Sequence, residues 1–425
     1  MSKNVSIILI YITIFISSIV FFQKPFEGYL SYIVFAIFFP IFIVRYGIPR
    51  YPILFFLPLL ISGIAYIQIG MNTYQLFFKI FTGFFLSVLF YHYVIQLFEY
   101  DVKKLFLYYL KGSLVVSYLG LFQVFSYFVG FGPGYNYGWI FNKWSVAQGG
   151  LGIRMNSVFS EPSYFAAVIA PAFFVCVYNL SVREPIFITK RQSLVIGIAY
   201  LLTFSSLGII GIFFAILMLL LNFGLLKYAI VFVPMFYFTF KYAYNEVPDF
   251  RARFDGTIDI FSTEDYRNYD IHGSSFVLYN NYHVALENFK RNPLFGTGLG
   301  SHPIAFDKYS LTNLQGVLKI EFNKADANSM FLRLMSETGL YGTLFMILLL
   351  FRCWVFRQRT TDREIWVMSN GIALIILLFL ARQGHYFLNG FPFFLWLYYY
   401  TWRKNKEIMA QNNTVIEIPP VTLPA

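Results

Sequence analysis

Long apolar runs separated by short polar segments extend over nearly the whole chain and predict a bundle of helices. A helix that crosses the hydrocarbon core of a bilayer needs roughly 17–25 mostly apolar residues. Runs close to this length lie at Val5–Phe22, Tyr29–Val44, Ile53–Ile69, Leu76–Leu97, Leu105–Val129, Tyr164–Leu180, Tyr228–Tyr242, Leu340–Phe356, Ile365–Leu380 and Tyr386–Tyr400. One longer run, Ser193–Phe223, fits either one tilted helix or two short helices that break at Ser205-Ser206-Leu207-Gly208.

The positions of lysine and arginine decide between these two possibilities, because both residues accumulate in cytoplasmic loops. Five basic clusters lie between the runs: Arg45 and Arg50, Lys103 and Lys104, Arg183 with Lys190 and Arg191, Arg357 with Arg359 and Arg363, and Arg403 with Lys404 and Lys406. They all fall on the same side of the membrane only if the long run Ser193–Phe223 crosses it twice. Lys3 and Lys227 fall on the same side, whereas the short outer loops hold only Lys24 and Arg382. We therefore predict about twelve transmembrane helices with both termini in the cytoplasm. The first helix is expected to be retained rather than removed as a signal peptide.

Two predicted outer segments are too long to be simple turns. Residues 130–163 form the first, and residues 243–328 form a large loop before the tenth span. Within the large loop, apolar residues recur at helical spacing over Ser275–Phe289, which makes the loop partly helical. Loops of this length are uncommon unless they are functional. The chemistry of this single integral membrane domain, residues 1–425, is therefore expected in these two loops.

The composition supports the membrane class. Of the 425 residues, 58% are hydrophobic and 12% are charged, whereas soluble domains carry about 25% charge. Soluble enzymes, disordered proteins and nucleic-acid-binding domains are thereby excluded, and the lipid bilayer becomes the first expected partner. The net charge of +11 follows from the cytoplasmic loops. Cys176 and Cys353 both lie in apolar runs, so neither a disulfide framework nor a zinc site is expected.

The end of the first outer loop combines an arginine, a glutamate and a helix start. Arg154 and Glu161 precede Pro162, a residue suited to the first turn of a helix. Helix N-termini favour anions, and the guanidinium of Arg154 adds a bidentate partner for phosphate. The alternative is an Arg154–Glu161 pair that only fixes the loop.

The large loop contains three alternating glycines after Arg291. Gly296, Gly298 and Gly300 permit a tight backbone with exposed N–H groups. The spacing is not that of a dinucleotide-binding motif. A structural hinge is the alternative reading.

A polar stretch follows, just before the tenth span. Asp326 either caps the next helix or acts as a base. Glu337 lies close to the apolar run, where a carboxylate is expected to meet a cation or to face a wet cavity. His302 is a further, weaker base candidate.

Two more basic residues lie near the predicted outer surface. Arg382 is in the last outer turn, and Lys79 is about one turn inside its span. Each either extends its charge to the membrane surface or lines a site.

Three of these segments resemble the O-antigen polymerase and ligase superfamily. Asn292–Gly300, NPLFGTGLG, resembles the pattern N-P-L-x-G-x-G, and Asn328–Gly342, NSMFLRLMSETGLYG, resembles H-N-S-x-x-x-x-x-x-E-x-G-x-x-G. Arg154–Ala166, RMNSVFSEPSYFA, resembles R-x-x-G-x-F-x-x-P-x-x-F-A, with Ser157 in place of the glycine. Asp326 and Ala327 precede Asn328 where ligases usually carry histidine, which favours the polymerase branch.

The resemblance implies a glycosyltransferase in the bacterial inner membrane with its active site facing the periplasm. Its substrates would be oligosaccharide repeat units on undecaprenyl pyrophosphate, which it joins into O-antigen or a related surface polysaccharide, with a chain-length regulator as a possible partner. Because only Glu27 is acidic in the first outer loop, and Asp255 and Asp259 do not form a D-x-D motif, we expect neither a metal nor a cofactor.

The anionic leaving group needs fixed cations. Arg154 is the first candidate, followed by Arg291 and Arg382, with Arg251, Arg253 and Lys79 in reserve. The motifs add Asn328, Gly296 and Gly298 to this binding set. Proton transfer from the attacking sugar hydroxyl needs a base, for which Glu161 and Asp326 rank together, before Glu337.

Three alternatives remain. An O-antigen ligase would move the finished glycan to lipid A core. A lipid-linked oligosaccharide flippase would carry charged residues at mid-membrane and short outer loops. A membrane scaffold for glycan assembly would depend on no single arginine.

Overall fold

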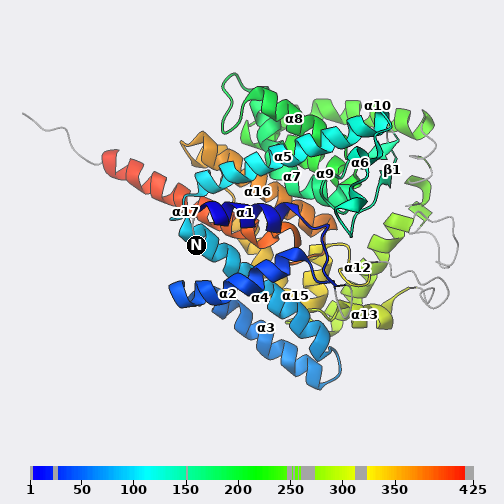
Figure 1. Ribbon diagram of the computed structural model, residues 1–425, viewed down its shortest axis with the longest axis vertical. Coiled ribbons are helices and arrows are strands. Elements are labelled where there is room, and N and C mark those ends of the chain that lie inside the picture. The colour runs from blue at the N-terminus through cyan, green and yellow to red at the C-terminus, as the bar shows by residue number, and fades with distance from the viewer. Residues whose placement is uncertain are drawn as a thin grey trace, which may run out of the picture.

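The computed structural model describes residues 3–22, 27–149, 152–246, 251, 254–256, 258–259, 273–311 and 323–416. This part of the chain is almost entirely helical (Figure 1). The helices of the first half are α1 (Lys3–Phe15), α2 (Leu30–Tyr46), α3 (Arg50–Gln68), α4 (Tyr74–Leu97), α5 (Val102–Phe128), α6 (Gly132–Tyr135), α7 (Pro162–Ser181) and α8 (Lys190–Leu201). Those of the second half are α9 (Ser206–Asn222), α10 (Ala229–Glu246), α12 (Gly273–Arg291), α13 (His302–Tyr309), α15 (Met330–Arg352), α16 (Arg363–Arg382) and α17 (Phe391–Ile416).

Short elements complete the fold in the first outer loop and at several turns. Strands β1 (Ala147–Gln148) and β2 (Ile153–Arg154) pair antiparallel, with Ala147 opposite Arg154. Single turns of 3₁₀ helix are η1 (Tyr137–Trp139), η2 (Leu226–Tyr228), η3 (Arg357–Arg359) and η4 (Leu388–Gly390).

The predicted class, an all-α membrane protein, is confirmed. Within the described residues, six helices are long and apolar enough to cross a membrane, namely α3, α4, α5, α7, α15 and α16. Three shorter apolar helices are α1, α2 and α9. A helix lies at each predicted run, and the long run Ser193–Phe223 is divided between α8 and α9, with Ser205 as the N-cap of α9. The helix predicted over Ser275–Phe289 is also present, as α12.

Three helix ends differ from the sequence prediction. α1 ends at Phe15, well before Phe22, and residues 16–22 continue in an irregular path. α17 begins at Phe391 rather than Tyr386, because the chain first makes a turn in which Asn389 has φ 54°. α15 starts at Met330, before the predicted span, and bends at Gly339, whose φ is 59°.

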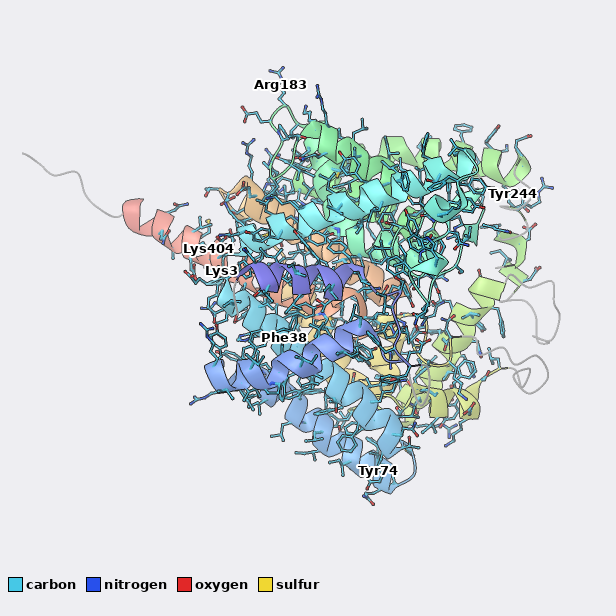
Figure 2. The ribbon with its side chains drawn as sticks, viewed as in Figure 1. Lys3, Phe38, Tyr74, Arg183, Tyr244 and Lys404 are labelled. Carbon is cyan, nitrogen blue, oxygen red and sulfur yellow. The ribbon has the colours of Figure 1, made fainter. Side chains whose placement is uncertain are left out.

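The turns gather at two ends of the bundle. At the charged end, ion pairs join Lys3 to Glu99 at 2.8 Å, Lys103 to Asp362 at 2.6 Å and Arg363 to Glu184 at 3.3 Å. Lys3 and Lys404 both lie at the left of Figure 2, and α17 projects from the bundle on that side (Figure 1). Three of the predicted cytoplasmic loops and the N-terminal helix therefore lie together.

The opposite end, the loop end, gathers the turns predicted to lie outside. Asn72 donates hydrogen bonds to the carbonyls of Thr297 and Leu299, and the Nε of Arg154 donates to the Thr203 carbonyl at 3.3 Å. The chain thus runs from the charged end to Thr203 along α8 and returns along α9 to Asn222, whose side chain accepts from the Arg357 amide.

The most buried part of the bundle is the pair α7 and α16. Their backbones approach closely at Gly371, where an added Cβ would lie 2.9 Å from the Pro171 carbonyl oxygen. Both helices have one end at the loop end of the bundle, where Pro162 begins α7 and Arg382 ends α16. This tight pair brings the start of α7 and the end of α16 together at the site described next.

Candidate active site

The glycine-rich segment packs directly against the bend of α15. The amides of Leu340 and Tyr341 donate to the carbonyls of Pro293 and Leu294, at 2.7 and 3.0 Å. In return, the amides of Thr297 and Gly298 donate to the carbonyls of Ser336 and Glu337. Two of the segments that carry the family resemblance therefore form one structural unit.

Glycine is required at both sides of this contact. A Cβ at Gly296 would lie 2.4 Å from the Ser336 carbonyl oxygen, and one at Gly339 would lie 2.5 Å from the Pro293 carbonyl oxygen. Both glycines also have positive φ, a region that costs other residues free energy. The Gly296 and Gly298 amides donate to Asn292 and Glu337, so in this structure they stabilise the protein rather than face a ligand.

Glu337 is fully buried and ion-paired. Its Oε1 accepts from the Nε of Arg333 at 3.0 Å, and its Oε2 accepts from the Gly300 amide at 2.8 Å. The expectation that this carboxylate meets a cation is confirmed. Arg333 also donates to the Gly384 carbonyl at 2.7 Å and lies over the ring of Tyr386. Glu337 therefore links the glycine-rich segment to the turn after α16.

A cavity of about 500 Å³ opens at the loop end. Its walls come from the starts of α7, α9 and α12, the end of α16 and the turn before α15; they are Glu161, Ser163, Tyr164, Ser206, Leu207, Gly273, Val277, Asn323, Asp326, Asn328, Arg382, Gln383 and Gly384. The cavity brings together four predicted site residues from three distant parts of the sequence: Glu161, Asp326, Asn328 and Arg382.

The cavity wall offers several groups that favour an anion. Among the described residues, Arg382 makes neither an ion pair nor a side-chain hydrogen bond. The neighbouring Gln383 is only 6% exposed, and within the same described set its carboxamide has no hydrogen-bond partner. The first turns of α7 and α9 also line the cavity, and neither helix has a side-chain cap on its amides. Uncapped helix N-termini carry partial positive charge.

Asp326, which lines the same cavity, pairs with a histidine from another turn. Its Oδ2 lies 3.1 Å from the Nε2 of His385, and Tyr164 Oη lies 3.1 Å from the same nitrogen. Burial alone would raise the pKa of Asp326. The hydrogen bond and charge of His385, the Asn328 amide and the charge of Arg333 outweigh burial and lower this pKa to about 2.

Asp326 does not cap α15, in contrast to one of the two roles considered for it. The N-cap is Ser329, whose side chain accepts from the Leu332 amide. Asp326 lies too far before the helix for that role, and its Oδ1 instead accepts from the Asn328 amide at 3.1 Å. The carboxylate is consequently directed toward the cavity wall and His385.

Arg154, the first candidate for the pyrophosphate, lies beside the cavity rather than on its wall. It sits on β2 and binds the Thr203 carbonyl. Thr203 Oγ1 in turn lies 3.4 Å from the Ser205 amide, at the start of α9. Arg154 thus positions the turn that presents α9 to the cavity.

The remaining predicted cations lie elsewhere. Arg291 is exposed at the end of α12, 4.0 Å from Glu287 and over the ring of Tyr309. Arg251 donates to the Tyr244 and Asn245 carbonyls. Arg253 lies outside the described residues, as does Lys24. Lys79 is half-buried on α4, within electrostatic range of Arg333 and Glu27.

His302 has a structural position. It is fully buried, and its Nε2 lies 2.9 Å from the Oδ1 of Asn281. Burial, followed by the charge of Arg333, lowers its pKa to about 3.

Four residues of the site were not selected from the sequence: Tyr164, Arg333, Gln383 and His385. Arg333 precedes Glu337 by four residues in an apolar helix, and opposite charges at this spacing face each other. That spacing was a usable signal. His385 carries no such local signal, because its partner Asp326 lies in a different turn.

Within the described residues, no group of three or more His, Cys, Asp or Glu side chains is arranged to hold a metal ion. The metal-independent mechanism stays a prediction. Comparison of the chain with protein-family models and with curated proteins gave no match.

Proposed function

We propose that this protein polymerises undecaprenyl-pyrophosphate-linked oligosaccharide repeat units at the periplasmic face of a bacterial inner membrane. The observation that carries the proposal is Arg382, whose side chain has no ion-pair or hydrogen-bond partner among the described residues. It lines a cavity together with two uncapped helix N-termini and with Asp326, the partner of His385. An anion site next to an acid–base pair is what transfer from a lipid pyrophosphate requires. The resemblance of three sequence segments to O-antigen polymerases gives the substrate class.

The proposed membrane arrangement has about twelve spans and both termini in the cytoplasm. The collection of basic loops at the charged end supports this orientation, because lysine and arginine accumulate in cytoplasmic loops. The loop end, with its cavity, would then face the periplasm. Exposed apolar side chains on α9, including Ile209 at 65% and Phe213 at 60%, supply a lipid-facing surface beside the cavity.

The leaving pyrophosphate would bind between Arg382 and the first turns of α7 and α9. Negative charge grows on the bridging oxygen as the anomeric C–O bond breaks, and fixed positive groups stabilise that charge. Arg154 would act through the turn that it holds at the start of α9. Undecaprenyl pyrophosphate leaves with the electron pair of the broken bond.

The acceptor is a hydroxyl of the non-reducing sugar on a second lipid-linked unit. Its oxygen attacks the anomeric carbon of the growing glycan while its proton passes to a base on the protein. Two carboxylates, Glu161 and Asp326, line the cavity and are the candidate bases for this proton transfer. Glu161 is exposed and accepts a hydrogen bond from Ser163, whereas Asp326 is engaged by His385. A chain-length regulator would act as a further protein partner.

A gel of surface glycan from a strain that lacks the gene tests the proposal. A polymerase defect leaves lipid A core that bears a single repeat unit, because export and ligation continue. Core without any repeat unit would contradict the proposal and indicate a ligase or a flippase. The side of the membrane on which lipid-linked sugar accumulates would then separate those two.

A further inference from the structure

We propose that His385 takes the proton from the acceptor hydroxyl and that Asp326 is the positioning residue that orients it. This inference rests on the proposed function and names the group that activates the acceptor. It changes the role of Asp326, because the carboxylate then acts through the imidazole.

The geometry around His385 fixes which ring nitrogen carries hydrogen. Asp326 Oδ2 and Tyr164 Oη both lie 3.1 Å from Nε2. A carboxylate accepts hydrogen bonds and does not donate them, so Nε2 carries the hydrogen. Nδ1 then keeps the lone pair, and among the described residues it has no hydrogen-bond partner. The His385 side chain is 28% exposed, and its contacts Tyr164 and Asp326 and its neighbour Gly384 all line the cavity.

Asp326 is a poor base in its own right. Its Oδ1 accepts from the Asn328 amide and from the Asn323 side chain, and its Oδ2 faces His385. These contacts stabilise the ionised form, in agreement with its lowered pKa. The imidazole of His385 in contrast has a ring nitrogen free to accept a proton, and histidine is the side chain that most often serves as a general base.

The groups around His385 stabilise the imidazolium that the step creates. Asp326 faces it from the turn before α15, Tyr164 from α7, and Glu27 exerts an electrostatic effect from the segment before α2. Glu27 is itself held by Lys143 and Tyr29, each at 2.5 Å. Arg333 exerts an electrostatic effect on Asp326 and is paired with Glu337. The negative charges of two carboxylates, Asp326 and Glu27, thus favour the imidazolium.

The position of the pair is enforced by the backbone. A Cβ at Gly384, next to His385, would lie 1.6 Å from the Asp326 carbonyl oxygen. The two turns therefore interlock, and only glycine permits the contact that brings the imidazole to the carboxylate. Arg333 holds the same turn through the Gly384 carbonyl.

The proposed step is balanced without a further reactant. The acceptor oxygen forms a bond to the anomeric carbon as its proton moves to Nδ1 of His385. The bond between that carbon and the pyrophosphate oxygen breaks, and its electron pair leaves with undecaprenyl pyrophosphate. The imidazolium, paired with Asp326, then releases its proton to solvent.

The test measures polymer formation against pH with the purified full-length protein and a synthetic lipid-linked repeat unit. His385→Gln is expected to lower kcat by about 10²- to 10⁴-fold and to remove the acid limb of the profile. Asp326→Asn is expected to move that limb to lower pH by about one unit, because a neutral amide no longer stabilises the imidazolium. Asp326→Glu restores the charge and is expected to return the limb toward its original position. His283→Gln, on α12, is the matched control and should leave the profile unchanged.

A second readout separates this inference from the proposed function. The chain has five histidines, so the titration of His385 can be followed by NMR in histidine-labelled protein and identified by its loss in His385→Gln. A shift of its midpoint to lower pH in Asp326→Asn supports the pairing. An unchanged midpoint, or a folded His385→Gln variant with wild-type rate and acid limb, overturns the inference. If the wild-type protein forms no polymer, the proposed function fails, while the NMR titration still decides whether Asp326 controls His385.

Discussion

Arg333 and Glu337 form an ion pair on one face of α15 that is almost completely closed off from solvent, with 3.0 Å between Nε and Oε1. Each partner also binds a separate loop. Glu337 accepts from the Gly300 amide, and Arg333 donates to the Gly384 carbonyl. The pair therefore joins the glycine-rich segment of the large loop to the turn that carries His385. Its integrity sets the geometry of the cavity wall.

Removal of one partner of this pair is expected to destabilise the protein strongly. Glu337→Ala leaves Arg333 buried without its carboxylate, a change that costs about 3–5 kcal/mol in comparable sites. The apparent melting temperature of the detergent-solubilised protein measures the effect. The double variant Arg333→Met with Glu337→Leu should recover much of the loss, because no unpaired charge remains. Equal melting temperatures for Glu337→Ala and wild type would contradict this role of the pair.

Arg382 is expected to contribute to catalysis rather than to folding. Arg382→Ala should reduce polymer formation by about 10²- to 10³-fold, the range for the loss of one group that stabilises developing charge. Protein level and melting temperature should stay near wild type, because no described residue pairs with Arg382. Lys290→Ala is the control, since this exposed lysine at the end of α12 pairs only with Glu287 among the described carboxylates. Wild-type glycan ladders in Arg382→Ala would contradict the assignment of Arg382 to an anion site.

Arg154 is expected to matter through the turn that it holds. Arg154→Ala releases the Thr203 carbonyl and with it the start of α9. Polymer formation should be lost at a normal protein level. Quantitative immunoblots measure the protein level, and surface-glycan gels measure polymer formation. A normal glycan ladder in this variant would contradict the prediction.

His302 is expected to make the stability of the folded protein depend on pH. Burial lowers its pKa in the folded protein to about 3, whereas the unfolded chain takes up the proton near pH 6.5. The unfolded state therefore binds more protons below pH 6.5, and stability is lost as the pH falls from about 6.5 toward 3, by up to about 1.4 kcal/mol per pH unit. Melting temperatures between about pH 7 and 4.5 should fall less in His302→Gln than in wild type. Parallel pH profiles for the two proteins would show that His302 is not buried in its neutral form.

Chelation is expected to leave the purified protein active. The proposed chemistry places its positive charge on arginine and helix N-termini, so it draws on no metal ion. Polymer formation should be the same before and after treatment with EDTA and dialysis. Loss of activity that magnesium or manganese restores would require a different mechanism.

The sequence predicts the positions of the helices far better than their ends and the contacts between them. Apolar runs locate the helices because a bilayer span must be continuous and apolar, and the break at Ser205 follows from the alternation of basic loops. The end of α1 at Phe15 could not be predicted, because residues 16–22 remain mostly apolar after the helix stops. The bend of α15 depends on the contact of Gly339 with Pro293, which lies in a distant loop.

For the candidate site too, the sequence identifies individual residues but not the contacts between them. Glu161 and Asp326 were selected as carboxylates that precede a helix, and Arg382 as a cation in the last predicted outer turn. Glu161 and Arg382 meet through the packing of α7 against α16, and Asp326 joins them through the contact of its carbonyl with Gly384. Local patterns do not contain that information. The role of His385 depends on the contact between Gly384 and Asp326, so no local pattern around the histidine indicates it.

Reconstitution of the purified protein tests polymerisation most directly. The purified protein in lipid nanodiscs, supplied with one synthetic undecaprenyl-pyrophosphate-linked repeat unit and no other enzyme, is analysed by gel for glycan length and by mass spectrometry for undecaprenyl pyrophosphate. We expect a ladder of products, with one undecaprenyl pyrophosphate released for each unit added. The ladder should be lost in Arg382→Ala. Intact substrate and no released carrier from folded wild-type protein would contradict it.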